Sequence, residues 1–318
     1  MFQIVLVGVG NLGSRYLQGL EKLDSKAIIT VIDPSVNSIN RAKALWNNAT
    51  STKFIDAVIW KRDLLELPNF IDLVIVSTTA DTRLSVIETI TNNFLVNYWV
   101  LEKVLAQSKS QLMSINDYLH SAKGVWVNTP RRIMVWHNHL KKMLLPGSGI
   151  QFERIGSDWG LACNSVHFID LVVWLTGEQL VSIDVSSLAN SWHESKRSGF
   201  YEVFGTLEAS FSLGSKLRLT DEPNQKNDYE IIVTDAKTTW MIDEEKGIAM
   251  SELGQKIDGQ LELQSDMTYR LVNDILELGR CRLPTLQESY KIHSILIEQL
   301  LSHWNHCKKC NDQLLPVT

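Results

Sequence analysis

The sequence predicts an α/β protein of two domains: a doubly wound parallel sheet, followed by an α+β domain with a mainly antiparallel sheet. Short β-branched runs alternate with helical patterns over about the first third of the chain. A glycine-rich turn follows the first run, and strand-like segments succeed one another after about residue 128. A length of 318 residues also suggests two domains, which we place at residues 1–125 and 126–318.

Strands and helices are expected to alternate in the first domain. Strands are expected at residues 4–7, 27–33, 73–78, 99–103 and 125–128. Helices are expected where apolar residues recur every three or four positions, at 12–23, 39–47, 84–93 and 107–119. Residues 54–62 fit either another strand or part of a helix.

The second domain is expected to begin with a helix and continue as an antiparallel sheet. The helix is predicted at residues 131–144, and a Pro-Gly-Ser-Gly turn follows at 146–149. Strands are predicted at 180–187, 205–213, 217–220, 229–234 and 238–242, with a polar loop at 221–228. Two helices, at 267–279 and 287–303, complete the pattern.

The composition excludes several classes of partner. Lys and Arg number 31 against 36 Asp and Glu, so the formal net charge is −5 and no basic surplus favours nucleic acid or an anionic membrane. No apolar run approaches the roughly 18 residues needed to cross a bilayer, and the N-terminus resembles no signal peptide. Four unevenly spaced cysteines do not suggest a disulfide framework. We therefore expect a cytoplasmic protein with neither nucleic-acid nor membrane partners.

A dinucleotide-binding motif, GVGNLG at residues 8–13, follows the first strand and opens the first helix. Gly8 permits the tight turn, Gly10 lets a pyrophosphate approach the backbone, and Gly13 allows close helix–strand packing. Amides at the helix start, including those of Asn11 and Leu12, would face the phosphates. The alternative is that these glycines only shape the turn.

Asp33 strengthens the motif because it ends the second strand 20 residues after Gly13. A carboxylate at this place accepts hydrogen bonds from the adenosine ribose hydroxyls. No arginine follows until Arg41, so NAD is favoured over NADP. Ser77, Thr78 and Thr79 end another strand at the ligand-binding edge, where they could contact the cofactor or simply begin a loop.

These residues resemble the Gfo/Idh/MocA family of oxidoreductases, which includes glucose-fructose oxidoreductase and inositol dehydrogenase. The similarity extends over nearly the whole chain, through Glu102-Lys103, the segment 167–170 with 174–177 behind it, and 283–285. It implies an N-terminal Rossmann domain that binds NAD and a C-terminal open-faced antiparallel sheet, with a sugar-type substrate over the nicotinamide. It also implies a homodimer or homotetramer formed through that sheet, and no metal.

Lys103 matches the lysine of the family's Glu-Lys-Pro motif, with Val104 in place of the proline. The resemblance implies that this lysine contacts the reacting hydroxyl or carbonyl, and Glu102 is expected beside the cofactor. An ammonium in a partly dry cleft next to a cationic nicotinamide releases its proton more readily, so it can exchange a proton with a substrate hydroxyl. The alternative is an ordinary surface lysine after a strand.

His167 matches the family's active-site histidine, and Asp170 its usual partner three residues later. Imidazole is a suitable proton acceptor because it titrates near neutral pH. Asp170 could fix the tautomer of His167, contact substrate or cap a helix. The alternative is a structural histidine before an apolar helix.

The sequence departs from the family just upstream of His167. Sugar dehydrogenases of the family often have an Asp four residues before the histidine, whereas this chain has Cys163. Asn164 can hydrogen-bond a sugar hydroxyl but cannot take up a proton, so acid–base chemistry would fall to Lys103 and His167. Cys163 is either a reactive thiol or a small buried side chain.

Further substrate contacts are expected from Arg131 and Trp159. A guanidinium can hold a carboxylate or phosphate bidentately, although Arg131 could instead pair with a neighbouring acid. The indole of Trp159 offers a sugar an apolar face. The last helix ends with potential metal ligands, but four ligands on one continuous segment make a poor tetrahedral site, and an exposed tail is the alternative; they are His303, His306, Cys307 and Cys310.

The sequence as a whole predicts an NAD-dependent oxidoreductase that transfers a hydride between nicotinamide and a sugar-type hydroxyl or carbonyl. The substrate class implied by the resemblance is a sugar, amino sugar, cyclitol or sugar nucleotide. One alternative is an NAD-binding sensor or regulatory subunit that has lost acid–base power at Cys163. Another is an enzyme that uses the cofactor transiently during elimination or epimerisation.

Overall fold

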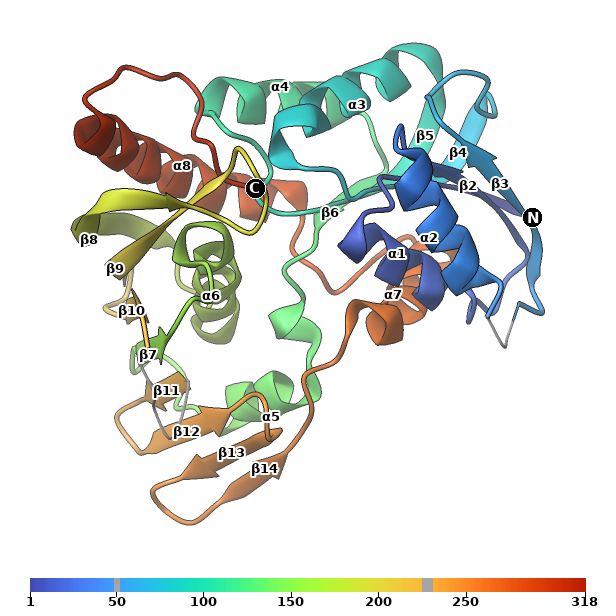
Figure 1. Cartoon of the computed structure of the whole chain (residues 1–318). Coiled ribbons are helices and arrows are strands. Elements are labelled where there is room, and N and C mark those ends of the chain that lie inside the picture. The colour runs from blue at the N-terminus through green and yellow to red at the C-terminus, as the bar shows by residue number, and fades with distance from the viewer. Residues whose placement is uncertain (49–51, 225–230) are drawn as a thin grey trace. The chain divides into compact units, whose positions relative to one another are not determined.

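A computed structural model describes residues 1–48, 52–224 and 231–318 (Figure 1). The chain forms two compact units. The first unit contains Met1–Ala106, Ser110–Asn128 and Glu262–Gln287, and the second contains Gln107–Lys109, Thr129–Leu261 and Glu288–Thr318. The predicted division at residue 125 differs from these units mainly because residues 262–287 return to the first unit.

The first unit is built on a six-stranded parallel sheet with the order β3-β2-β1-β4-β5-β6. Residues on both faces of β1 and β4 are buried at their carboxyl ends, which explains their continuous apolar sequences. The strand order reverses between these two strands, so their carboxyl ends form the switch point of the sheet. The strands are β1 (Phe2–Val7), β2 (Ala27–Ile32), β3 (Ile55–Lys61), β4 (Phe70–Val76), β5 (Leu95–Leu101) and β6 (Gly124–Val127).

Helices cover both faces of this sheet, with α1 and α2 on one face and α3 and α4 on the other (Figure 1). The expected doubly wound architecture is therefore confirmed, and the ambiguous segment 54–62 is a strand. A fifth helix, α7, lies so close to α1 that a Cβ added at Gly19 would be 2.5 Å from the Cβ of Thr268. The helices are α1 (Asn11–Leu20), α2 (Val36–Trp46), α3 (Ala80–Asn93), α4 (Lys109–Leu119) and α7 (Gln264–Leu278).

The second unit is built on an eight-stranded sheet with the order β14-β13-β12-β11-β7-β10-β9-β8. Neighbouring strands are antiparallel except for the β7–β10 pair, which is parallel. The predicted mainly antiparallel sheet is confirmed, although β7, β13 and β14 were not predicted. The strands are β7 (Gln151–Gly156), β8 (Leu180–Glu194), β9 (Tyr201–Phe211), β10 (Lys216–Asp221), β11 (Ile231–Thr234), β12 (Thr239–Asp243), β13 (Ile248–Ser251) and β14 (Lys256–Asp258).

Two segments of this unit differ from the predicted elements in their bounds or continuity. The predicted strand at 229–234 corresponds to β11, but residues 229 and 230, like residues 225–228 of the predicted loop, lie outside the described part of the chain. The single helix predicted at 131–144 is two elements, η1 (Pro130–Ile133) and α5 (Val135–Met143). They are separated because the backbone of Met134 is extended, with φ −65° and ψ 140°.

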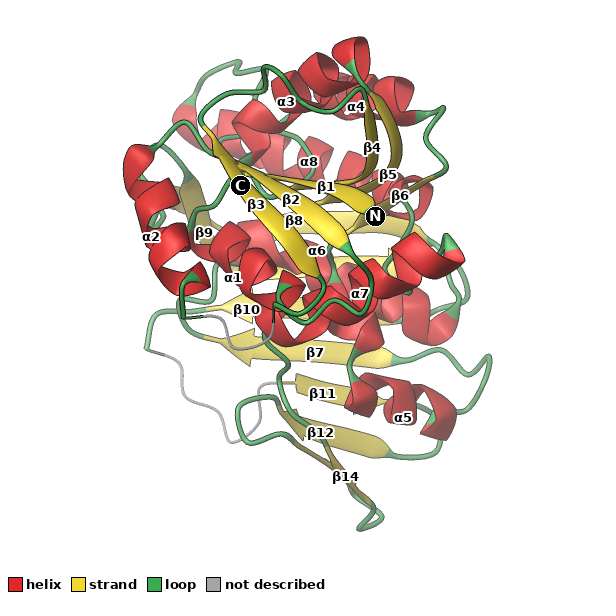
Figure 2. Cartoon of the chain, turned by 90° about the vertical axis from the view of Figure 1, so that its right-hand side faces the viewer, coloured by secondary structure: helices red, strands yellow, loops and turns green. Residues whose placement is uncertain are grey.

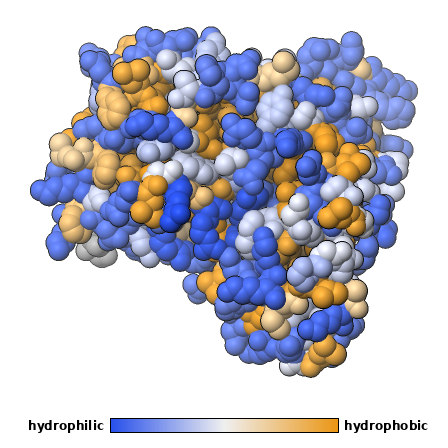
Figure 3. Space-filling model, turned by 180° about the vertical axis from the view of Figure 1, so that it is seen from behind, coloured by the Kyte–Doolittle hydropathy of each residue, from blue (hydrophilic) through white to orange (hydrophobic). Residues whose placement is uncertain are grey.

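Helix α6 (Leu161–Thr176) packs against β9 and β10, and α8 (Leu286–Lys308) is the last helix. Strands β7 and β10 alternate buried and more exposed residues, so their inner side chains face the core and their outer ones face solvent. Figure 2 shows the strands of this sheet running side by side. Seen from behind, the molecule carries small apolar groups among hydrophilic residues (Figure 3).

Candidate functional site

The glycine loop between β1 and α1 is packed against backbone on both sides. Gly8 has a φ of +86°, and a Cβ there would lie 3.1 Å from the backbone carbon of Ser77. A Cβ on Gly13 would lie only 1.9 Å from the carbonyl oxygen of Gly8. Both positions therefore require glycine for backbone packing alone.

Gly10 differs from its two neighbours because space is open around it. Apart from Gly10 and the residues next to it in the chain, no described residue has an atom within 4 Å of a Cβ built on Gly10. Helix α1 begins at the next residue, Asn11, and no described side chain caps it. Unpaired amides and the helix dipole at such a terminus attract anions, and the space at Gly10 on this terminus is open.

Asp33 ties the end of β2 to the glycine loop. One carboxylate oxygen accepts a hydrogen bond from the Val9 amide at 2.8 Å, and the other accepts one from the Ser35 amide at 2.8 Å. Each oxygen has two lone pairs and keeps one for a further donor, such as a ribose hydroxyl. The side chain is largely buried, with 8% of the residue exposed. Asp33 is thus held in a fixed orientation by the glycine loop and by the start of the segment after β2.

The three hydroxyl residues after β4 have different surroundings. Ser77 lies against the glycine loop, and its hydroxyl is 2.5 Å from the Gly8 carbonyl oxygen, to which it donates. Thr79 is the N-cap residue of α3. Thr78 Oγ1 is buried without a hydrogen-bond partner among the described residues. The loop-forming alternative thus accounts for Ser77 but not for the buried Thr78 hydroxyl, which has no partner among the described residues.

Glu102 follows β5 and is held inside the protein. Tyr16 donates its hydroxyl to Oε1 at 2.5 Å, and the Asn128 amide donates to the same oxygen at 2.6 Å. Burial raises the pKa of the Glu102 carboxyl, although these hydrogen bonds and the charges of Lys103 and Arg83 oppose the rise. The expected cofactor contact of Glu102 therefore competes with internal partners that the sequence did not reveal.

Lys103 follows Glu102 at the carboxyl edge of the parallel sheet and is partly exposed. The next residue, Val104, is buried, and its carbonyl accepts a hydrogen bond from the buried guanidinium of Arg83. Arg83 also donates to the Thr78 carbonyl, so it links the segments that follow β4 and β5. Lys103 is thus the accessible residue of a segment fixed on both sides.

In the second unit, the predicted substrate residues lie on or near α6. His167 lies inside this helix, not before it as predicted. Cys163, Asn164 and His167 are half-buried, whereas most of α6 is buried. Residues three or four apart share one helical face, so these three side chains form a partly accessible stripe. The Asn164 amide donates to the Trp159 carbonyl at 2.6 Å.

Two carboxylates that the sequence analysis missed hold the start of α6. Glu202 of β9 accepts the Ala162 amide at 2.8 Å and the Cys163 amide at 3.3 Å. Asp221 of β10 accepts the Gly160 amide at 3.0 Å. Negative charge stabilises a helix N-terminus, so these acids position the turn that carries Cys163. Carboxylates are therefore present beside the position where the family has aspartate, but they come from distant strands.

Asp170 is buried and ion-paired, contrary to its predicted substrate-binding role. Asp170 is 1% exposed. Its Oδ2 accepts a hydrogen bond from Nε of Arg132 at 3.0 Å, and its Oδ1 accepts one from Nη2 of Arg132 at 2.5 Å. Glu288 binds the same guanidinium at 3.3 Å. Burial raises the pKa of Asp170 to about 6, against the charge of Arg132. Asp170 is thus a structural ion-pair residue that fixes α6 against η1.

Arg131 pairs with an internal acid, which is the alternative to a ligand contact given above. Glu244 accepts hydrogen bonds from Nε of Arg131 at 3.2 Å and from Nη2 of Arg131 at 3.0 Å. The guanidinium also lies 4.2 Å from the ring centre of Phe168. His137 contacts the Arg131 carbonyl through Nδ1 at 2.9 Å, and burial lowers the pKa of His137 to about 4.

Trp159 is also used mainly in packing. Its indole N–H donates to the Thr220 carbonyl at 3.0 Å, and its ring meets Phe168 edge-on with centres 5.5 Å apart. Arg154 lies over the Trp159 ring at 4.5 Å. Trp159 is half-buried, so a sugar could stack only on the accessible part of its ring.

The potential metal ligands at the end of α8 have other partners. His303 accepts the indole N–H of Trp192 at 3.1 Å, and Cys310 contacts Asn305 at 3.1 Å. The Sγ of Cys307 lies 3.6 Å from His303 Nε2. Within residues 1–48, 52–224 and 231–318, no three His, Cys, Asp or Glu side chains are grouped so as to hold a metal ion. In the same part of the chain, no helix is both long and apolar enough to cross a membrane.

A doubly wound sheet with a glycine loop after its first strand is typical of dinucleotide-binding domains. No family model matches the sequence, and no curated protein sequence matches it. Solved structures, by contrast, match along nearly the whole chain. An oxidoreductase from Agrobacterium radiobacter, in complex with NAD+, L-tartaric acid and magnesium, is 14% identical, with a TM-score of 0.73 over 96% of this chain and 97% of that chain.

Two other similar structures are sugar or cyclitol dehydrogenases. UDP-N-acetylglucosamine 3-dehydrogenase from Acidithiobacillus ferrooxidans is 12% identical, with a TM-score of 0.68 over 94% of this chain and 96% of that chain. Scyllo-inositol dehydrogenase from Lactobacillus casei, with bound NAD(H) and scyllo-inositol, is 15% identical, with a TM-score of 0.65 over 94% of this chain and 96% of that chain. The chain thus has the fold of Gfo/Idh/MocA-type oxidoreductases, as predicted.

Proposed function

We propose that this protein is an NAD-dependent oxidoreductase that transfers a hydride between nicotinamide and a sugar-type hydroxyl or carbonyl. The observation that carries the proposal is the open space at Gly10, where α1 begins and Asp33 is held at the same sheet edge. A purely structural turn does not need an open anion site. The similar structures solved with NAD+ or NAD(H) support this choice of cofactor.

When bound, NAD supplies the hydride acceptor, carbon C4 of its nicotinamide. The amides at the start of α1 bind the pyrophosphate, and Asp33 accepts the ribose hydroxyls. Its negative charge repels a 2′-phosphate, which disfavours NADP. These residues fix the cofactor at the carboxyl edge of the sheet, and Thr78 offers a further hydroxyl there.

Lys103 and His167 are the residues that we assign to proton transfer. The Lys103 ammonium donates a hydrogen bond to the reacting oxygen, and the His167 imidazole accepts the hydroxyl proton when the substrate is oxidised. Cys163 stands where related sugar dehydrogenases have a carboxylate, so proton transfer depends on these two groups. Asn164 on the same stripe of α6 hydrogen-bonds a substrate hydroxyl.

The substrate class that we propose is a sugar, amino sugar, cyclitol or sugar nucleotide. The support is the fold shared with dehydrogenases of scyllo-inositol and of UDP-N-acetylglucosamine. Cys163 and Asn164, which share the partly accessible stripe with His167, are small and neutral, and this suits a polyhydroxylated substrate better than a strongly anionic one. The internal pairing of Arg131 with Glu244 also argues against recognition of an acidic group by that guanidinium.

The test compares two lysine variants. We expect Lys103→Met to abolish turnover while NAD affinity stays near that of the parent, because Lys103 acts on substrate. Lys123→Met removes an exposed lysine of the same unit and is the control, expected to retain full activity. Turnover equal in both variants would remove Lys103 from the mechanism.

Two outcomes would replace the proposal itself. Tight NAD binding without turnover on any cyclitol, sugar or sugar nucleotide would favour a regulatory NAD-binding protein. Solvent deuterium in the substrate without net NADH would instead indicate transient oxidation followed by epimerisation or elimination.

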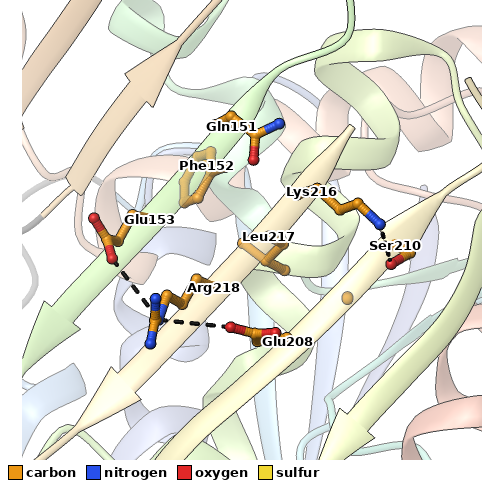
Figure 4. A pocket seen from close by; sticks show the side chains of 9 residues that line it. Gln151, Phe152, Glu153, Glu208, Ser210, Lys216, Leu217 and Arg218 are labelled. Carbon is orange, nitrogen blue, oxygen red and sulfur yellow. Dashed lines mark hydrogen bonds and ion pairs between the residues drawn. The ribbon is translucent and has the colours of Figure 1, made fainter. Parts of the chain in front are cut away.

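We also propose that the protein is a cytoplasmic homodimer or homotetramer assembled through the outer face of the second sheet. This face has a hollow of about 370 Å³ over β7, β9 and β10 (Figure 4). Arg218 forms ion pairs there with Glu208 at 3.7 Å and with Glu153 at 4.0 Å. Sedimentation of the parent and of Arg218→Glu tests this face. We expect the variant to dissociate, whereas a monomeric parent would overturn the assembly.

A further inference from the structure

The residue before Lys103 belongs to a buried chain of polar side chains in the first unit. Tyr16 of α1 and Asn128, which follows β6, both donate to Oε1 of Glu102, at 2.5 and 2.6 Å. The Asn128 amide is also 2.8 Å from the Gln264 side-chain oxygen at the start of α7. Tyr16, Glu102 and Asn128 are 1%, 3% and 4% exposed, so little water competes for these hydrogen bonds.

This geometry is more specific than packing requires. A buried carboxylate is costly unless donors satisfy it, and an apolar residue would fill the same space without that cost. Two neutral donors that converge on one oxygen stabilise the ionised form of the carboxyl group. A buried carboxyl group held by two donors therefore lies immediately before the residue assigned to proton transfer.

The charged and titratable groups around Glu102 come from several elements. Lys103 lies next to it in sequence, and its positive charge lowers the pKa of Glu102, as does that of Arg83 from α3. Tyr16 of α1 is neutral, because burial and Glu102 raise the pKa of its hydroxyl. Cys281, which follows α7, also faces Tyr16 and is a neutral thiol, because burial raises its pKa to about 11.

We propose that Tyr16 and Asn128 are positioning residues that hold Glu102 in place, and that Glu102 in turn fixes the chain segment that presents Lys103 for proton transfer. The role assigned to Lys103 rests on the proposed function, whereas the state of Glu102 does not. Holding the neighbouring residue in place limits the freedom of the segment that carries Lys103. Arg83 completes the arrangement, because it holds the Val104 carbonyl on the other side of Lys103.

The experiment uses the full-length protein and the variant Tyr16→Phe. This change removes one hydroxyl and keeps the ring that packs α1, so the fold is expected to persist. The midpoint at which the Glu102 carboxyl takes up a proton should rise by about one pH unit, since one of its two donors is lost. Carbon-13 NMR of labelled glutamate, assigned with Glu102→Gln, measures this midpoint in the absence of any substrate.

The matched control is Tyr118→Phe, which removes another tyrosine–glutamate hydrogen bond in the same unit. Tyr118 donates to Glu88 at 2.6 Å on the exposed surface between α4 and α3. We expect this variant to leave both the Glu102 midpoint and the pH profile of kcat unchanged.

Activity measurements supply the second readout. In Tyr16→Phe the acid limb of the kcat profile should move to higher pH with the Glu102 midpoint, while NAD affinity is unchanged. In Glu102→Gln kcat should fall about tenfold or more, since small misplacement of a reacting group has large effects. Adding Tyr16→Phe to Glu102→Gln should then cause no further change in the profile, because Tyr16 acts through Glu102.

The outcomes separate the two proposals. A Glu102 midpoint that does not move in Tyr16→Phe overturns this inference, whether or not the protein is an enzyme. A midpoint that moves in a protein without turnover supports the arrangement around Glu102 and counts against the proposed function. A double variant that shifts the profile beyond Glu102→Gln alone would show that Tyr16 acts by another route and would also overturn the inference.

Discussion

Separate substitutions of Gly10 and Gly13 by alanine should have different effects: Gly13→Ala should lower the stability of the fold, and Gly10→Ala should weaken cofactor binding. At Gly13 the added Cβ would lie 1.9 Å from a backbone oxygen, where contact normally requires about 3.2 Å, so the loop must move by about 1.3 Å. Overpacking of this kind costs about 3 kcal/mol, and the better helix propensity of alanine returns about 1 kcal/mol. We expect Gly13→Ala to lose about 2 kcal/mol of unfolding free energy.

Gly10→Ala should behave in the opposite way. Its backbone, with φ −60° and ψ −160°, is allowed for alanine, and apart from the residues next to it in the chain no described residue has an atom within 4 Å of the new Cβ. The free energy of unfolding should therefore change by less than about 1 kcal/mol. The methyl group would occupy the expected pyrophosphate position, so NADH affinity should fall at least about tenfold, or about 1.4 kcal/mol.

Urea unfolding without ligand and equilibrium titration with NADH measure these two effects. In the parent, NADH at about 100 times its dissociation constant should add about 2.7 kcal/mol to the unfolding free energy, and Gly10→Ala should lose most of this gain. Parent-like NADH affinity in Gly10→Ala would refute the placement of the phosphates. Equal destabilisation of both apo variants would refute the packing argument.

Three further predictions follow from contacts in the two units. Asp33→Ala should weaken NAD binding and reduce the preference for NAD over NADP. The reason is that Arg62, whose Nη2 donates to the Pro34 carbonyl at 3.3 Å, stays beside the ribose position. Unchanged affinities for both cofactors would exclude the ribose contact. Asp170→Asn should cost about 3–5 kcal/mol in urea unfolding, since it leaves the buried Arg132 charge poorly compensated; a loss below about 1 kcal/mol would contradict the ion-pair role. His137 binds a proton in the unfolded chain below about pH 6.5 but in the folded protein only near its lowered pKa of about 4, so stability is retained above pH 6.5 and is lost as pH falls. The expected loss between about pH 7 and pH 5 is about 2 kcal/mol, and His137→Gln should remove that component; an equal pH dependence in both proteins would count against it.

The nucleotide half of the fold could be predicted because its signals are local. Alternation of β-branched runs with helical spacing identifies β–α units, and the glycine motif follows directly from a strand in sequence. The roles predicted for Gly8 and Gly13 agree with the space around them. Even the ambiguous segment 54–62 was resolved only by pairing with β2, which is a tertiary contact.

The second unit was harder to predict because its contacts are distant in sequence. Strands β13 and β14 have four and three residues, too few for a clear alternating pattern. Asp170 is paired with Arg132, 38 residues earlier, and nothing in the local sequence distinguishes that pair from a contact with His167. The return of residues 262–287 to the first unit depends on packing of α7 against α1.

In the candidate site, too, some residues could be predicted from the sequence and others could not. Asp33 could be selected from motif spacing, and Lys103 and His167 from the family resemblance, whereas the residues that hold them could not be predicted. Tyr16 lies 86 residues from Glu102, and Glu202 lies 39 residues from Cys163. Such partners are chosen by the three-dimensional arrangement of elements, and a single sequence carries no signal for them.

Oxidation of a substrate by the purified protein tests the account most directly. The protein would be mixed with NAD+ and a panel of cyclitols, sugars and sugar nucleotides, and the absorbance of reduced nicotinamide followed while mass spectrometry identifies any product. We predict NADH in equal amount to a product two hydrogens lighter than one of these substrates. Failure of the protein to bind either NAD+ or NADH, with no product from any member of the panel, would contradict the central claim.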